Sequence, residues 1–486
     1  MLLTFLACAL APQAALAHAS LVASVPASDA VLPAPPREIE LRFDEPVQPL
    51  VLQLIGPDGV ATPLTRHRVD GGTVTADLPA LGNGTHALSW RVASADGHPV
   101  GGTVVFSVGA PSGGFMPDAA AHTPRAVLFA IWMSRTLLFL ALFVGVGGSF
   151  FVVWCVPGGL PRSGNVALSA LLGIGAAAAL LSVGLQGLDA LALPWPKLAE
   201  PDTWRAGMTT AYGTTAVLAF SALIAAYAAL QGAGAGIRKM VALAALLGVG
   251  LAISASGHAA TAEPQLVTTT LVFLHVVTIA FWVGALFPLA LLLCGRHAAG
   301  AALIRFGKLI PLPLGALILT GAALAFVQLQ AVSDLWTTNY GRVLAAKLAL
   351  LILLFGLALL NRAVLTPRFT QGDGGAPRRL CRSIAAELVI VTVILGVVGL
   401  WRFTPPPRLL AHPGPGQIET HLQTGRVMAD VTLSPAKDDG WTLLLELQTI
   451  TLEPLDPKEV GVLLSKPAAG IEPIRHAARR LETGRW

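Results

Sequence analysis

A histidine at position 18 follows a short apolar segment that ends in small residues. The pattern Ala15-Leu16-Ala17 predicts signal peptidase cleavage after Ala17, which would remove residues 1–17. His18 would then begin the mature protein and carry a free α-amine and an imidazole on one residue. These two nitrogens can close a chelate ring on a metal ion, and Cu(II) favours such ligands.

Two further candidate ligands lie in the segment Ser94-Ala-Asp-Gly-His-Pro-Val100. Asp96 and His98 are two residues apart, so on an extended chain their side chains point to the same side. With His18 they offer an amine, two imidazoles and a carboxylate, a set that favours Cu(II) over Cu(I). Taken alone, the segment is an ordinary surface turn. The histidine that cleavage would expose makes a copper site the preferred interpretation.

The composition is that of a membrane protein. Of 486 residues, 54% are hydrophobic and 12% are charged, and the mean hydropathy is +0.69. The net charge of +5 lies largely in loops beside apolar segments, which indicates membrane topology and not nucleic-acid binding. Eight stretches are long enough to cross a bilayer: 126–153, 165–190, 211–231, 238–256, 266–293, 310–330, 342–363 and 383–403.

Basic residues fall mostly in alternate loops between these stretches. The positive-inside rule places the most basic loops in the cytoplasm, so we expect a multi-pass protein of the bacterial inner membrane with both ends in the periplasm. There is no G-x-x-x-x-G-K-[ST] pattern, which excludes ATP hydrolysis by a P-loop and favours gradient-driven or facilitated movement.

Short alternating runs broken by turn residues flank the apolar part. Five of them precede it: 37–43, 51–55, 73–78, 85–92 and 102–108. They predict an immunoglobulin- or cupredoxin-like β-sandwich over 18–109, followed by a linker at 110–124 and a helical membrane domain at 125–404. Residues 412–486 predict a small β-rich domain with strands at 427–433 and 442–447, whereas 471–486 favours helix or loop. The fold class is thus a mixed multidomain membrane protein.

Several segments carry a family likeness. The stretches from His18 to Asp29, Ile39 to Pro46, Asp96 to Gly102 and Val105 to Val108 resemble CopC, a periplasmic copper-binding protein. The stretches Phe273 to Leu289 and Tyr340 to Lys347, with Asn361-Arg362, resemble CopD. The chain therefore resembles a CopC–CopD fusion.

This resemblance implies a copper uptake protein. His18, Asp96 and His98 would hold Cu(II), supported by Glu45, and copper would pass to the membrane domain. Expected partners are the copper ion, the lipid bilayer and a periplasmic copper chaperone or reductase, without nucleic acid. The methionine-rich loops of some CopC proteins are missing, which argues against a separate Cu(I) site in the sandwich.

Two histidines mark a candidate copper path through the membrane, which Cu(I) could also use. His275 lies near the middle of the fifth apolar stretch, where a polar side chain is costly and usually faces a protein interior or a water-filled path. His258 lies near the periplasmic end of the fourth. A hydrogen-bonded structural role for His275 and a solvated position for His258 are the alternatives.

For other polar residues in the apolar stretches, a structural role is at least as good an explanation as a role in metal binding. Arg135 and Lys347 are expected to form ion pairs or to snorkel, and Asp189 and Glu387 could bind a cation. Cys155, Cys294 and Cys381 would lie near the cytoplasmic face as free thiols, where they form a candidate Cu(I) exit site; no disulfide framework is expected.

The preferred prediction is a copper importer that is not an enzyme. Two other function classes stay open. One is an intramembrane redox protein, in which His258 and His275 would ligate haem or copper. The other is a periplasmic copper buffer or delivery protein for the assembly of copper enzymes, to which His412, His421 and His476 would contribute.

Overall fold

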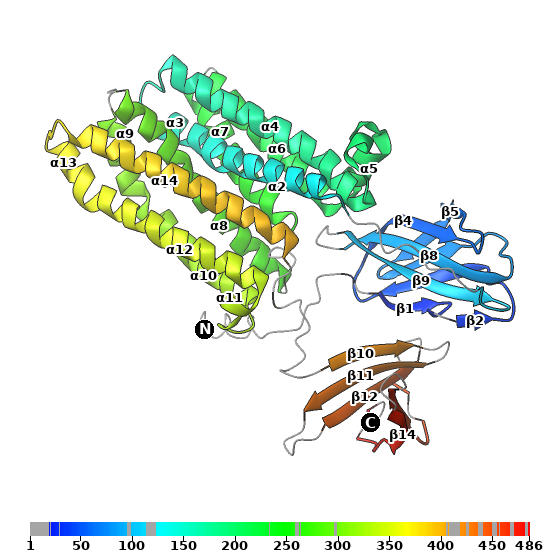
Figure 1. Ribbon diagram of the computed structural model, residues 1–486. Helices are drawn as coiled ribbons and strands as arrows, with labels where there is room; N and C mark the ends of the chain where they lie inside the picture. The colour runs from blue at the N-terminus through cyan, green and yellow to red at the C-terminus, as the bar shows by residue number, and fades with distance from the viewer. Residues whose placement is uncertain are drawn as a thin grey trace. The chain divides into compact units, whose positions relative to one another are not determined.

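The computed structural model describes most of the chain. The described residues are 19, 21–28, 30–94, 99–112, 123–232, 234–257, 262, 264–295, 299–404, 407, 418–423, 427–435, 441–449, 454–455, 457–466, 471–481 and 485–486. Three parts follow one another along the sequence: a β-sandwich, a helical domain and a C-terminal group of strands (Figure 1).

The sandwich has two sheets. One has the strand order β1-β3-β7-β6 and the other β2-β9-β8-β4-β5. Their bounds are β1 Leu21–Val25, β2 Ala30–Leu32, β3 Glu38–Phe43, β4 Gln48–Ile55, β5 Ala61–Pro63, β6 His67–Asp70, β7 Thr73–Asp77, β8 Gly84–Ala93 and β9 Pro99–Val108. The five strands that alternation predicts are present. Of the strands it did not predict, β2, β5 and β6 have only three or four residues, too few to establish a period.

The sandwich core follows from alternation along the strands. On β3, Ile39, Leu41 and Phe43 are buried while the residues between them are not. They pack in one cluster with residues of the facing sheet, including Leu88 and Phe106. The period of two thus determines which face of each strand joins the core.

The helical domain contains eight helices that are long and apolar enough to cross a membrane, counted among the described residues. The spans are α2–η1–α3 (Arg125–Cys155), α4 (Arg162–Leu191), α6 (Ala211–Gln231), α7 (Ala235–Ser254), α8 (Gln265–Cys294), α10 (Pro311–Gln328), α12–η3–α13 (Asn339–Thr370) and α14–η4 (Ala376–Phe403). Shorter helices connect them: η2 Trp195–Ala199, α5 Pro201–Thr209, α9 Gly300–Leu309 and α11 Asp334–Thr337. The eight predicted stretches are therefore confirmed as helices.

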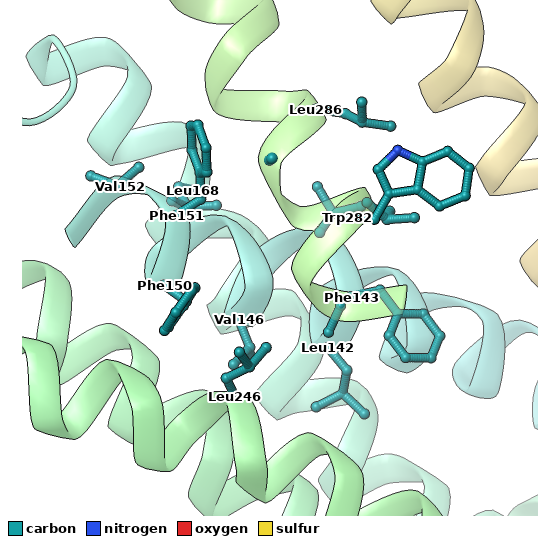
Figure 2. Packing of buried hydrophobic residues seen from close by; sticks show 14 of the residues in the cluster. Leu142, Phe143, Val146, Phe150, Phe151, Val152, Leu168, Leu246, Trp282 and Leu286 are labelled. Carbon is teal, nitrogen blue, oxygen red and sulfur yellow. The ribbon is translucent and has the colours of Figure 1, made fainter. Parts of the chain in front are cut away.

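Helix α8 is the central packing element of this domain. It packs against α3, α7, α10 and α14. Figure 2 shows part of the resulting core, in which Trp282 of α8 lies near Phe143 of the first span. Since α8 also carries His275, the residue singled out for chemistry lies on the helix with the most extensive packing.

The first span and α8 approach each other at glycine. A Cβ atom added to Gly147 would lie 1.9 Å from the carbonyl oxygen of Ala280, and one added to Gly284 would lie 2.2 Å from the carbonyl carbon of Gly147. Small residues allow helix backbones to come this close in membranes. The π-helical segment η1 (Ala141–Val146) directly precedes the contact.

Replacing Gly284 by alanine is expected to separate these two spans. The added methyl group meets backbone that cannot rotate away, so we expect destabilisation by about 1–3 kcal/mol. Gly173→Ala on α4 is the matched control, because a Cβ there meets no atom within 4 Å. Thermal unfolding of the two variants in detergent tests the contact. Equal midpoints for both would show that the close approach is absent.

The C-terminal part forms two small sheets. Strands β10 (Ile418–Gln423), β11 (Val427–Pro435) and β12 (Trp441–Thr449) form one, and β13 (Gly461–Lys466) and β14 (Ile471–Ala477) form the other. The two predicted strands are confirmed. The prediction of helix or loop from residue 471 is wrong over β14, which pairs antiparallel with β13. Pro473 interrupts the local pattern there, and an edge strand tolerates proline.

Candidate metal sites

The expected copper ligands fall outside the described residues. This holds for His18, Asp96 and His98, and also for His258 in the candidate membrane path. The structure does describe their immediate neighbours in the chain. Ala19 is 2% exposed and belongs to the sandwich core, and β8 and β9, which flank residues 95–98, are adjacent strands of one sheet.

Glu45 lies in the connection after β3. It is half-buried, and it follows Phe43 by two residues. Phe43 pairs with Leu21 at the start of β1, and its ring meets Trp90 of β8 edge-on at 5.1 Å between centroids. The chain just after residue 18 and the chain just before Glu45 are therefore held side by side in one sheet.

His275 makes a defined hydrogen bond within the helical domain. Its Nδ1 lies 3.1 Å from Oγ1 of Thr320 on α10. The Thr320 hydroxyl has one proton, which it donates to the carbonyl of Ala316 at 2.7 Å or of Leu317 at 3.1 Å. When the hydroxyl donates to either carbonyl, it accepts from the ring, and Nδ1 then carries the hydrogen and leaves the lone pair on Nε2. Metal-binding histidines are commonly fixed in one tautomer in this way.

The surroundings of His275 contain a small residue and a cation. A Cβ at Gly321 would lie 3.0 Å from Cε1 of the ring, so glycine leaves room for the imidazole against α10. Lys347 of α12 is close enough to interact electrostatically with His275, and its ammonium lies 5.0 Å from the ring centroid of Trp401. Lys347 thus makes a cation–π contact in place of the expected ion pair or snorkelling.

A charged cluster occupies one end of the first, second and last spans. Arg402 Nη2 and Asp189 Oδ2 form an ion pair at 2.5 Å, with side chains only 6% and 9% exposed. The Asp189 carboxylate also accepts a hydrogen bond from Thr123. Arg135 lies 4.6 Å from the ring centroid of Tyr212 and interacts electrostatically with both members of the pair. A second guanidinium group thus lies within electrostatic range of a buried ion pair.

Glu387 and Asn361 form a second buried polar contact. The amide Nδ2 of Asn361 donates to Glu387 Oε1 at 2.6 Å. The two candidate cation-binding carboxylates, Asp189 and Glu387, are therefore not brought together: one pairs with Arg402 and the other with Asn361.

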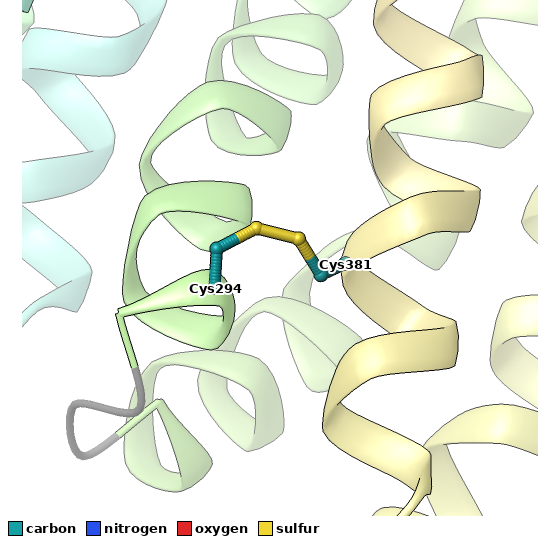
Figure 3. Close-up of a disulfide and its surroundings, with 2 residues drawn as sticks. All are labelled: Cys294 and Cys381. Atoms are coloured by element: carbon teal, nitrogen blue, oxygen red, sulfur yellow. A yellow bond between two sulfur atoms is a disulfide. The ribbon is translucent and has the colours of Figure 1, made fainter.

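The expectation that no disulfide forms is wrong. Cys294 at the end of α8 and Cys381 in α14 are joined, with their Cα atoms 5.7 Å apart (Figure 3). The prediction relied on the expected cytoplasmic location of the cysteines. The packing of α8 against α14 decides the outcome instead, because it brings the two thiols within bonding distance. Cys155 is buried and free. A three-thiolate exit site would require reduction of this bond.

No group of three or more His, Cys, Asp or Glu side chains that could hold a metal occurs among the described residues. Sequence reasoning also missed the partners Thr320 and Arg402. A threonine in an apolar helix is too common to single out. Arg402 stood at the end of the last apolar stretch, where its charge could have indicated a buried acidic partner.

Two protein-family models match parts of the chain. The model of the CopC domain matches residues 21–109, and that of copper resistance protein D matches residues 300–401. Copper transport protein CutJ of Bacillus subtilis (strain 168) is 26% identical over 421 residues, which cover 82% of this chain and 76% of that protein. Copper resistance protein C of Xanthomonas campestris pv. juglandis is 38% identical over 114 residues, 21% of this chain and 88% of that protein.

Two solved structures are similar to about a fifth of the chain. CopC from Methylosinus trichosporium OB3b has 27% identity, covers 20% of this chain and 100% of that chain, and has a TM-score of 0.18. PcoC, a methionine-rich copper resistance protein from Escherichia coli, has 29% identity, covers 19% of this chain and 99% of that chain, and has a TM-score of 0.17.

Proposed function

Because the chain belongs to the copper resistance proteins and joins a CopC domain to a CopD domain, we propose that it imports copper across the bacterial inner membrane. Its family is one of copper transport rather than catalysis, and its helices are those of a multi-pass membrane protein. In this proposal the signal peptide 1–17 is removed and both soluble parts lie in the periplasm.

Capture is the first step. The amine and imidazole of His18 bind Cu(II) together with Asp96 and His98, and Glu45 supports the ligands. The burial of Ala19 in the sandwich core supports this arrangement, because an anchored residue 19 limits where the preceding residue can go. A ligand set held in place loses less conformational entropy when the metal binds.

Transport through the helical domain is the second step. The observation that supports it is the geometry of His275. An imidazole that donates from Nδ1 to Thr320 presents the Nε2 lone pair in the interior of a membrane domain, on the helix around which the others pack. His258 passes copper to His275 from the periplasmic side. Nearby Lys347 disfavours a resident cation there, which suits a transient ligand better than a storage site.

The test is uptake by the purified full-length protein in liposomes. We expect copper to accumulate without ATP, and a variant with Asp96→Asn and His98→Gln to lose uptake at low external copper while keeping it at high copper. The variant removes capture but leaves the helical domain intact. Accumulation equal to that of protein-free liposomes would contradict the proposal.

A further inference from the structure

Glu387 is a buried acidic group that copper capture and His275 leave unused. It is 2% exposed and lies on α14, five residues after Arg382, the last basic residue before the apolar part of that helix. At 1.5 Å per residue this is about 7.5 Å along the axis. An acidic side chain buried in a membrane segment is costly and usually functional.

No positive charge compensates this carboxylate among the described residues. The elements packed against α14 carry these basic residues: Arg125, Arg135, His275, Arg342, Lys347, Arg362, Arg368 and Arg402; α14 itself carries Arg378, Arg379 and Arg382. None of them forms an ion pair with Glu387, whose identified partner is Asn361. Arg362, next to Asn361 in the chain, donates instead to the carbonyl of Gly307 at 3.2 Å. A charge buried without a counter-ion is strongly unfavourable, so the group must be neutralised.

The partner of Glu387 indicates that the carboxyl group is neutralised by a proton. Asn361 is 9% exposed, and its Nδ2 donates to Glu387 Oε1 while its Oδ1 is buried without a hydrogen-bond partner in the described part of the chain. An unsatisfied buried acceptor costs about 1–3 kcal/mol. A protonated carboxyl group both accepts and donates, so neutral Glu387 can return a hydrogen bond to Oδ1 and close a cyclic acid–amide pair.

Ser383 lies between Glu387 and the basic end of the helix. It lies one turn before Glu387 on α14, and its buried Oγ also lacks a partner among the described residues. A hydroxyl can accept a proton on one lone pair and release its own. Asn361 and Glu387 are therefore in contact, and Ser383 lies one helical turn nearer Arg382 without a hydrogen bond to either of them.

We propose that Glu387 and Asn361 form a proton-binding site whose proton exchanges through Ser383 with water at the cytoplasmic end of the helical domain. Resting on the proposed import function, the site couples transport to proton exchange. Glu387 releases H⁺ to cytoplasmic water, the resulting carboxylate stabilises a copper cation in the inner half of the domain, and reprotonation lets the metal leave.

Infrared difference spectroscopy of the full-length protein in liposomes tests the proton directly. At neutral pH we expect a carbonyl stretching band from a protonated glutamic acid. This band should shift when glutamate is labelled with ¹³C, and it should be absent from Glu387→Gln. The band should shift in Asn361→Ser, which keeps Glu387 but removes the amide. Glu200→Gln is the matched control, since Glu200 is exposed and paired with Lys197. The proposal would be overturned if the wild type showed no band of protonated Glu387. It would also be overturned if Na⁺ or K⁺ removed that band at constant pH, because the site would then bind a metal cation in place of a proton.

Copper uptake separates this proposal from the function on which it rests. Glu387→Gln vesicles are expected to lose the dependence of uptake on internal pH that the wild type shows. If the wild type accumulates copper but shows no protonated Glu387, the proton site is wrong and import stands. If the band is present and no copper accumulates, import is wrong and proton binding stands.

Discussion

Replacing His275 by leucine is expected to reduce copper accumulation in liposomes to the level of vesicles without protein. Leucine fills a similar space but offers no lone pair, so the ligand that the path requires in the membrane interior is lost. Binding of Cu(II) to the N-terminal sandwich should be unchanged, because His275 belongs to a separate part of the chain. Uptake of ⁶⁴Cu and Cu(II) titration of the same preparation measure both quantities.

Thr320→Val refines this prediction. It removes the acceptor of the Nδ1 hydrogen while keeping the side-chain shape, so the ring loses its fixed tautomer. Loss of such a supporting hydrogen bond typically lowers metal affinity about 10- to 100-fold. His67→Leu, at an exposed position on β6, is the control for loss of a histidine. Undiminished uptake by His275→Leu would contradict the path, and a Soret band that this variant abolishes would assign His275 to haem.

Asp189→Asn is expected to destabilise the helical domain by about 3–5 kcal/mol. The substitution leaves Arg402 buried without its carboxylate partner and within electrostatic range of Arg135, and two like charges then repel in a medium of low dielectric. Thermal or denaturant unfolding in detergent measures the change.

An exposed ion pair provides the matched control. Asp202 and Arg205 on α5 are about four-fifths exposed, so Asp202→Asn should change stability by less than about 0.5 kcal/mol. The double variant Asp189→Leu with Arg402→Met should recover much of the loss, because apolar residues can replace a buried ion pair. Equal effects of Asp189→Asn and Asp202→Asn on unfolding in detergent would contradict the buried ion pair.

The elements of this fold could be predicted because their signals are local. Apolar runs of about 20 residues predicted the eight spans, and alternation predicted strands such as β3. Strand β14 was missed because its stability depends on pairing with β13, and Pro473 obscures its pattern.

The contacts that give the site residues their surroundings could not be predicted, because they join distant parts of the chain. Arg402 and Asp189 are 213 residues apart, and Cys294 and Cys381 are 87 apart. Which helix faces pack together decides such pairs, and the sequence offers many equivalent arrangements. His275 could be singled out by its depth in an apolar stretch, but its tautomer depends on Thr320, 45 residues away.

The proposed function depends on a mature chain that begins with His18, whose amine and imidazole both bind Cu(II). The most direct test is the electron paramagnetic resonance spectrum of the processed full-length protein with Cu(II), compared with a variant that carries one extra residue before His18. We predict a nitrogen-rich type 2 copper spectrum that the extension abolishes. An identical spectrum from both proteins, or a processed chain that begins at any other residue, would contradict it.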